Sequence, residues 1–146
     1  MLVNVTFVPV AVGEKTYTPT LPRKGSTEAA AFDVSTPYPF EIKVGEKHLV
    51  NTGLVIKIPR GYCVQILPRS GLACKRGITI PNAPGLIDRD YCGPEDIVKV
   101  MLVNQGDEDA EFVEGDRIAQ MLFVPYLSPD MNLVGETEGK QSRGGF

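Results

Sequence analysis

The sequence offers little from which a histidine-based or thiol-based site could be built. Its 146 residues contain no tryptophan, one histidine and three cysteines. A single histidine, His48, excludes the zinc sites that need two or more imidazoles. The cysteines Cys63, Cys74 and Cys92 form no CxxC pair. An odd and sparse set of this kind is typical of a reducing compartment rather than of a disulfide-bonded scaffold.

Long apolar runs and an excess of charge of one sign are also missing. No stretch approaches the roughly 18 apolar residues of a membrane span. The segment Met1–Thr6 has neither the charged region nor the cleavage site of a signal peptide. The formal net charge is −3, which provides no global positive field for nucleic acid. We therefore expect a soluble, cytoplasmic protein that binds neither membrane nor nucleic acid and holds any polyanionic ligand through a local cluster.

Glycine and proline, by contrast, are abundant, with 15 and 12 residues. Together with Asn and Asp they divide the apolar residues into short runs. Short apolar runs separated at regular intervals by turn-forming residues are typical of an all-β sandwich or barrel. The runs predict strands over residues 3–10, 40–42, 48–51, 54–58, 62–67, 78–80, 97–104, 111–113 and 118–125.

One short helix is predicted over residues 70–77. Ser70 is a suitable N-cap, two basic residues fill the last turn, and Gly77 can adopt the left-handed conformation that ends a helix. The chain becomes polar and Gly-rich towards its end. We therefore predict a single β-sandwich domain over residues 1–134 and a flexible C-terminal arm over residues 135–146.

The segment Leu67–Ala73 has the features of an anion site. A strand ends at Pro68 and the predicted helix begins at Ser70, so the unpaired N–H groups and the positive end of the helix dipole favour an anion there. Arg69 adds a planar, permanently charged group suited to phosphate oxygens, and Gly71 allows close approach of the backbone. The alternative is an ordinary capped helix with a solvated arginine.

The segment Asn82–Gly93 places two apolar residues between a turn and two acids. In an extended chain Asp88 and Asp90 face the same side. A carboxylate beside apolar neighbours can act as a general base towards water, or it can be a solvated acid at the end of a strand. Tyr91 offers a flat face to a ring or a sugar, or packs against its neighbours.

Three further segments each carry candidates. Gln120 interrupts the apolar strand predicted before residue 125, and it is either a hydrogen-bonding core residue or a ligand contact. Asp33 lies between two apolar residues and either caps local structure or binds a ligand. At the C-terminus, a segment with one cation and one aromatic ring, Arg143–Phe146, either folds over a ligand or frays.

In combination and in order, these segments resemble the five motifs of the trimeric dUTPase (deoxyuridine triphosphate nucleotidohydrolase) family. The resemblance spans about residues 28–146 and rests on Ala31-Phe32-Asp33-Val34, Pro68-Arg69-Ser70-Gly71-Leu72-Ala73, Gly85-Leu86-Ile87-Asp88-Arg89-Asp90-Tyr91, Gly115-Asp116-Arg117-Ile118-Ala119-Gln120-Met121 and an abbreviated Arg143-Gly144-Gly145-Phe146. The chain departs from the family at Cys92, where a basic residue is usual, and at Pro94-Glu95-Asp96, which lengthen the path to the next strand.

The resemblance implies a jelly-roll-like β-sandwich or barrel with one short helix, assembled as a homotrimer with shared active sites. It implies hydrolysis of dUTP to dUMP and pyrophosphate with Mg²⁺, which limits uracil in DNA and supplies dUMP for dTMP synthesis. In that family scheme Asp88 activates the water that attacks the α-phosphorus, and Tyr91 lies under the deoxyribose.

The remaining roles follow from the same resemblance. The uracil would be held by Asn82 and the neighbouring hairpin, with expected contacts at Gly85, Leu86, Ile87 and Lys99. The phosphates of a neighbouring subunit's nucleotide would be held by Arg69, Ser70 and Gly71. Asp33 and Gln120 would bind the metal through water only. Arg143 and Phe146, from a third subunit, would close over the γ-phosphate and the base.

Other functions on a similar scaffold are a dCTP deaminase-type enzyme, a dUTP-gated regulatory or binding protein, and a structural jelly roll without a ligand. The deaminases usually have a glutamate base in the strand after the third motif. Here that strand, residues 97–103, contains no glutamate, which favours the hydrolase.

Overall fold

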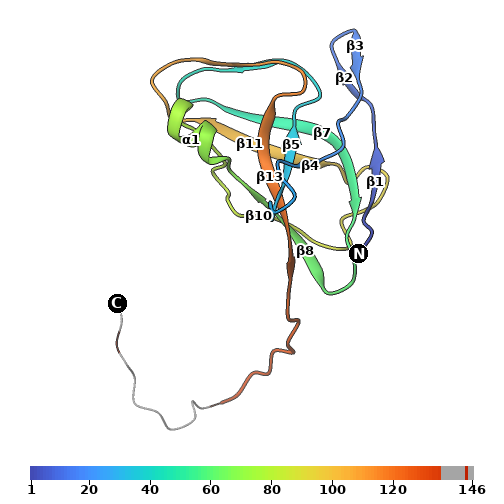
Figure 1. The fold of residues 1–146 in the computed structure, drawn as a ribbon. Coiled ribbons are helices and arrows are strands. Elements are labelled where there is room, and N and C mark those ends of the chain that lie inside the picture. Colours follow the sequence, from blue (N-terminus) through green and yellow to red (C-terminus); the bar gives the residue numbers. More distant parts are fainter. Residues whose placement is uncertain (136–143, 145–146) are drawn as a thin grey trace.

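The computed structural model describes residues 1–135 and 144, and within them the chain forms antiparallel β-sheets and one short helix (Figure 1). One large sheet has the order β1 (Asn4–Phe7), β7 (Lys47–Lys57), β11 (Val98–Asn104) and β9 (Ile78–Thr79). The other has the order β10 (Gly85–Ile87), β8 (Tyr62–Leu67), β13 (Arg117–Pro125), β5 (Phe32–Ser35) and β4 (Arg23–Lys24). Two small sheets pair β12 (Ala110–Phe112) with β6 (Phe40–Ile42) and β2 (Val10–Val12) with β3 (Lys15–Tyr17).

A single apolar core is shared by the two large sheets. Alternate residues of a strand point to the same face, and in β11 Val98, Val100 and Leu102 are buried while Lys99 between them is exposed. Val64 and Ile66 of β8 are buried from the opposite sheet and belong to the same cluster. This arrangement confirms the predicted all-β sandwich.

Three of the predicted runs form strands that are divided or joined differently. The run over residues 3–10 divides into β1 and β2, on either side of Pro9, which lacks the N–H that a ladder needs. Conversely, the runs 48–51 and 54–58 form one strand, β7. Gly53 does not end this strand but adopts a φ of +67° inside it, where the register with β11 shifts.

The helix α1 (Ser70–Arg76) lies where it was predicted, and Gly77 ends it at a φ of 65°. The predicted N-cap is wrong. The capping position belongs to Arg69, whose backbone is extended and whose side chain makes no capping hydrogen bond. Because Arg69 follows β8 and Pro68, it stays extended, and Ser70 becomes the first helical residue.

A column of stacked side chains crosses the end of the sandwich that carries β6 and β12. The guanidinium of Arg76 lies 4.6 Å from the ring centroid of Phe112. Phe112 stacks on Phe40 at 4.7 Å, and Phe40 stacks on His48 at 4.4 Å. Within the described residues, Nε2 of His48 is buried without a hydrogen-bond partner, and burial lowers the pKa of this imidazole.

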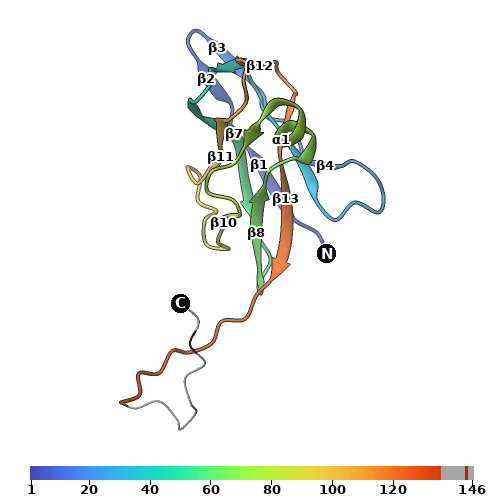
Figure 2. The same ribbon diagram turned by 90° about the vertical axis from the view of Figure 1, so that its left-hand side faces the viewer.

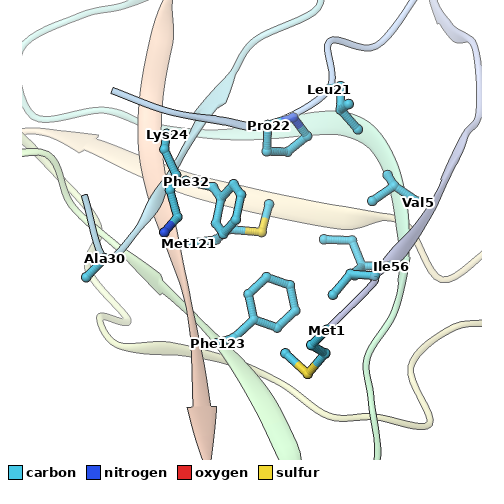
Figure 3. Close-up of a pocket in the computed structure, with 11 residues that line it drawn as sticks. Met1, Val5, Leu21, Pro22, Lys24, Ala30, Phe32, Ile56, Met121 and Phe123 are labelled. Carbon is cyan, nitrogen blue, oxygen red and sulfur yellow. The ribbon is translucent and has the colours of Figure 1, made fainter. Parts of the chain in front are cut away.

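An apolar cavity of about 390 Å³ lies beside β1 (Figure 3). Phe32, Phe123, Ile56 and Met121 line it, and Lys24 is the single charged residue among its lining residues. The other side chains that line it are apolar.

The last strand ends at Pro125, and the segment that follows extends away from the sheets (Figure 1). Leu127, Met131 and Leu133 in this segment are more than nine-tenths exposed. The predicted boundary between residues 134 and 135 stays a prediction, because 136–143 and 145–146 lie outside the described residues. Among the residues described, no helix is long and apolar enough to cross a membrane.

The left-handed glycine within β7 allows a prediction about stability. A Cβ on Gly53 would lie 2.4 Å from Cγ of Pro19 and 2.5 Å from the carbonyl oxygen of Val8. Gly53→Ala therefore combines left-handed strain with overpacking and should lower the free energy of unfolding by roughly 3 kcal/mol or more. Gly45→Ala is the matched control, because Gly45 has a φ of +81° but no described atom within 4 Å of its Cβ. It should cost only roughly 1–2 kcal/mol, and equal losses in urea unfolding at one protein concentration would contradict the packing argument.

The partly buried imidazole of His48 gives stability a pH dependence. Because burial lowers the pKa of His48 below its ordinary value of 6.5, the unfolded chain binds the proton more readily than the folded one. The contribution of His48 is therefore fully present above about pH 6.5 and is lost as the pH falls below it. His48→Phe, which preserves the stack and removes the titrating group, should flatten the slope of unfolding free energy between about pH 5 and 7. An unchanged slope would assign the pH dependence to other groups.

Candidate functional site

One cluster, which contains the predicted residues Asp33 and Arg69 together with Arg117, surrounds the carboxylate of Asp33 on β5. Arg69 donates from Nε to Oδ1 of Asp33 at 3.1 Å, and Arg117 donates from Nη1 to Oδ2 at 3.2 Å. Arg69 also donates from Nη1 to the carbonyl oxygen of Arg117 at 3.2 Å. Both guanidinium groups are thus oriented by a single acid, and the cluster of Asp33, Arg69 and Arg117 has a net charge of +1.

Gln120 lies directly opposite Asp33 in the pairing of β13 with β5. Its Nε2 donates to the carbonyl oxygen of Pro68 at 3.0 Å, which leaves its carbonyl oxygen as an acceptor. Ser70 and Gly71, at the start of α1, are exposed, and no described atom lies within 4 Å of a Cβ built on Gly71. We call Asp33, Arg69 and Arg117 the cation cluster. This cluster and the open first turn of α1 beside it can bind the oxygens of a phosphate chain.

A second group of predicted residues, which we call the hairpin group, lies around the hairpin that contains β10. Asn82, Gly85, Leu86, Ile87 and Lys99 together line a small cavity of about 70 Å³. A Cβ on Gly85 would lie 3.4 Å from Cβ of Ile66 and 3.5 Å from Nδ2 of Asn82. Any side chain here would narrow the cavity, so glycine keeps it open to a small planar ring.

Asp88 and Tyr91 are the ends of the turn that follows β10. The N–H of Tyr91 donates to the carbonyl oxygen of Asp88 at 3.2 Å, and its hydroxyl donates to the carbonyl oxygen of Ile97 at 3.1 Å. The ring of Tyr91 is held in place while 39% of the residue remains exposed. The expectation that Asp88 and Asp90 share one face of an extended chain is wrong, because Asp90 lies within this turn.

The residues that depart from the family pattern form a tight turn of their own. Oδ2 of Asp96 accepts a hydrogen bond from the N–H of Gly93 at 2.7 Å, and the N–H of Asp96 donates to the carbonyl oxygen of Gly93 at 3.1 Å. The additional residues close on themselves, so the chain still reaches β11 with Lys99 beside the hairpin cavity. Cys92 is exposed.

Asp88 and the cation cluster lie towards opposite ends of β8, whereas Gly85, which pairs with Ile66, lies nearer the cluster. Ile87 pairs with Val64, so Asp88 comes level with Cys63, and both border one open hollow. Leu67 pairs with Gln120 at the other end, where Arg69 follows. The six steps along the chain from residue 63 to residue 69 correspond to roughly 20 Å of extended strand. Figure 2 shows α1 at one end of β8 and the segment after β13 leaving from the other.

Arg117 is the site residue that sequence reasoning missed. It was noted only as part of the segment Gly115–Met121, although a charged residue next to a Gly-Asp turn was the available signal. Two of the predicted residues, Arg143 and Phe146, lie outside the described residues. Within the described part of the chain, no group of three or more His, Cys, Asp or Glu side chains could hold a metal ion directly.

Comparison with known proteins gives one consistent result. The dUTPase family model matches residues 18–145. A deoxyuridine 5'-triphosphate nucleotidohydrolase of Anaeromyxobacter sp. (strain Fw109-5) is 44% identical over 125 residues, which cover 86% of this chain and 82% of that protein. Another, from Nautilia profundicola, is 42% identical over 127 residues, covering 86% and 87%. A mutant dUTPase from phage phi11 of S. aureus, described with a structural Mg(II) ion, has the same fold, with a TM-score of 0.78, 21% identity and coverage of 95% and 100%.

The Asp33 cluster predicts unequal contributions from its two ion pairs. The side chain of Arg69 is 23% exposed and that of Arg117 is 56% exposed, so water screens the second pair more strongly. Double-mutant cycles with Asp33→Ala should therefore give a coupling of about 1 kcal/mol to Arg69→Ala and below about 0.5 kcal/mol to Arg117→Ala. Unfolding in urea at fixed ionic strength measures both couplings. The reverse order would show that Arg117 is the better anchored partner.

Proposed function

This chain belongs to the dUTPase family, and from that membership we propose that it hydrolyses dUTP to dUMP and pyrophosphate. The observation that carries the proposal is the match over residues 18–145. It is supported by the chemistry of the site, because the cation cluster suits a triphosphate and the small hairpin cavity suits one pyrimidine ring. We place the reaction in the cytoplasm, which the free thiols of all three cysteines favour.

In this proposal the hairpin group binds the nucleoside. Asn82 and the backbone at Gly85, Leu86 and Ile87 bind the uracil edge, with Lys99 at the rim of the same cavity. The deoxyribose lies on the ring of Tyr91, where a 2′-hydroxyl finds no room. Asp88 is exposed next to this position and acts as the general base that takes a proton from the attacking water. Bound in this way, the α-phosphorus and the water are oriented for in-line attack.

The cation cluster binds the phosphates. Of the five N–H donors of Arg69, two are used by Asp33 and by the carbonyl oxygen of Arg117, and the others serve phosphate oxygens. Ser70 is exposed at the start of α1 and offers its hydroxyl, and Gly71 allows close approach of the backbone. Fixed cations at this position stabilise the charge that develops on the leaving pyrophosphate.

The separation of Asp88 from the cation cluster along β8 supports a site shared between copies. Asp88 and Arg69 are held about 20 Å apart by an extended strand, whereas a nucleoside triphosphate must contact both. We therefore propose a homotrimer in which the cation cluster of one subunit binds the phosphates of the nucleotide held by its neighbour. Arg143 and Phe146 would close the site from a third subunit.

Mg²⁺ fits the donors of this site only through water. Both oxygens of Asp33 already accept hydrogen bonds from guanidinium groups, and the described residues contain no acidic cluster for direct ligation. Asp33 and the carbonyl oxygen of Gln120 can still accept hydrogen bonds from metal-bound waters, as Mg²⁺ commonly keeps several waters and binds mainly to substrate phosphates. When bound, the ion would neutralise phosphate charge.

The activity is tested by pyrophosphate release with Mg²⁺ from dUTP, dTTP, dCTP and UTP. We expect turnover of dUTP alone, because the hairpin cavity excludes a 5-methyl group and Tyr91 excludes a 2′-hydroxyl. Asp88→Asn should retain affinity for dUTP and lose about 10²–10⁴-fold in kcat, the range expected for a missing general base.

The matched control is Asp90→Asn, which changes the other exposed acid of the same turn and should retain turnover. Equal turnover of all four nucleotides would reject the proposed activity, and ammonia release from dCTP would favour the deaminase-type alternative. Normal kcat in Asp88→Asn would instead reject only the assignment of the base.

A further inference from the structure

The helix that carries Ser70 and Gly71 has few apolar contacts to hold it. Against the described part of the chain, none of the residues of α1 is buried, and Leu72 is the one member that packs against the core cluster, at its edge. A helix of this length is not stable by itself. The position of its first turn must therefore be fixed elsewhere.

The C-terminal end of α1 rests on the loop between β11 and β12. A Cβ on Gly106 would lie 2.4 Å from the carbonyl oxygen of Arg76, so the two backbones are in direct contact. Gln105 donates its N–H to the carbonyl oxygen of Gly77 at 2.9 Å. The fully buried Asn104 holds this loop, since its side chain donates to the carbonyl oxygens of Ile42 and Glu108 and accepts from the N–H of Gly106.

The side chain of Arg76 forms the second attachment of the same helix end. Its Nη2 donates to the carbonyl oxygen of Glu111 at 2.8 Å, and its guanidinium lies over the ring of Phe112. Phe112 is buried and is backed by Phe40 and His48 in the stacked column. A planar cation thus joins the last residue of α1 to the interior of the sandwich, a contact that lysine cannot reproduce.

We propose that Arg76 is a positioning residue for the phosphates of the nucleotide: by locking the end of α1 onto the Phe112–Phe40–His48 column, it sets the place of Ser70 and Gly71 at the other end. The inference rests on the proposed function, since it takes the first turn of α1 as the phosphate contact. Arg76 itself touches no part of the substrate in this scheme. The backbone from Gly85 to Ile87 is held by its pairing with β8 rather than by α1, so loss of the attachment should weaken dUTP binding more than dUMP binding.

The test compares Arg76→Lys and Arg76→Gln with the unaltered protein. Affinity for a non-hydrolysable imido analogue of dUTP with Mg²⁺ should fall about tenfold, while affinity for dUMP stays within about twofold. The KM for dUTP should rise more than kcat falls. Lys75→Gln is the matched control, because Lys75 is an exposed basic residue in the same turn, and it should leave both affinities unchanged. Amide hydrogen exchange over residues 70–77, without nucleotide, should be faster in both Arg76 variants and not in Lys75→Gln.

Several outcomes would overturn the inference. Recovery by Arg76→Lys alone would mean that only a positive charge near the helix C-terminus matters. A parallel loss of dUMP and imido-dUTP affinity would indicate general destabilisation, and unchanged amide exchange would show that Arg76 does not hold the helix. Absence of dUTP hydrolysis in the unaltered protein is a separate result, because it rejects the proposed function while the exchange measurement still decides whether Arg76 anchors α1.

Discussion

The pairing of β8 with β10 on one side and with β13 on the other fixes where Asp88 and Gln120 lie. Val64 and Ile66 must point into the core, and a shift of one residue would turn both outwards. The hydrophobic core therefore determines the register, and the register determines that Asp88 comes level with Cys63 while Gln120 pairs with Leu67. The placement of the chemically active groups is a consequence of packing rather than of contacts among themselves.

Ion pairs then orient the side chains whose backbone positions the strands determine. One carboxylate, Asp33, orients the guanidinium groups of Arg69 and Arg117, which would otherwise repel each other and lose side-chain entropy on binding a ligand. Neither pair is fully buried, so the desolvation cost is moderate and the remaining donors stay accessible. A chain with a net charge of −3 can in this way present a local cationic surface with fixed geometry.

Elements that depend on residues close together in the sequence could be predicted from local patterns. The alternation in 62–67, bounded by Pro59-Arg60-Gly61 and Pro68, gave the bounds of β8, and Gly77 marked the end of α1. The errors concern contacts between distant segments. Gly53 was interpreted as a strand break because its role in a bulge depends on β11. Ser70 was taken as the cap, whereas the extended backbone of Arg69 moves the capping position back by one residue. Arg117 was overlooked because its partner, Asp33, is 84 residues away.

The stiffness of β8 also constrains how the proposed reaction can work. An extended strand held between two neighbours cannot bend to bring Asp88 towards Arg69, so no rearrangement within one sandwich could unite the base with the phosphate ligands. In the proposed scheme each copy therefore contributes both halves to different sites. The base and the nucleoside contacts come from one hairpin, and the phosphate contacts come from another chain. Catalysis then requires assembly of the subunits. The attachment of α1 through Arg76 seems purely structural in one chain, but in this scheme it affects a nucleotide held by a neighbouring subunit.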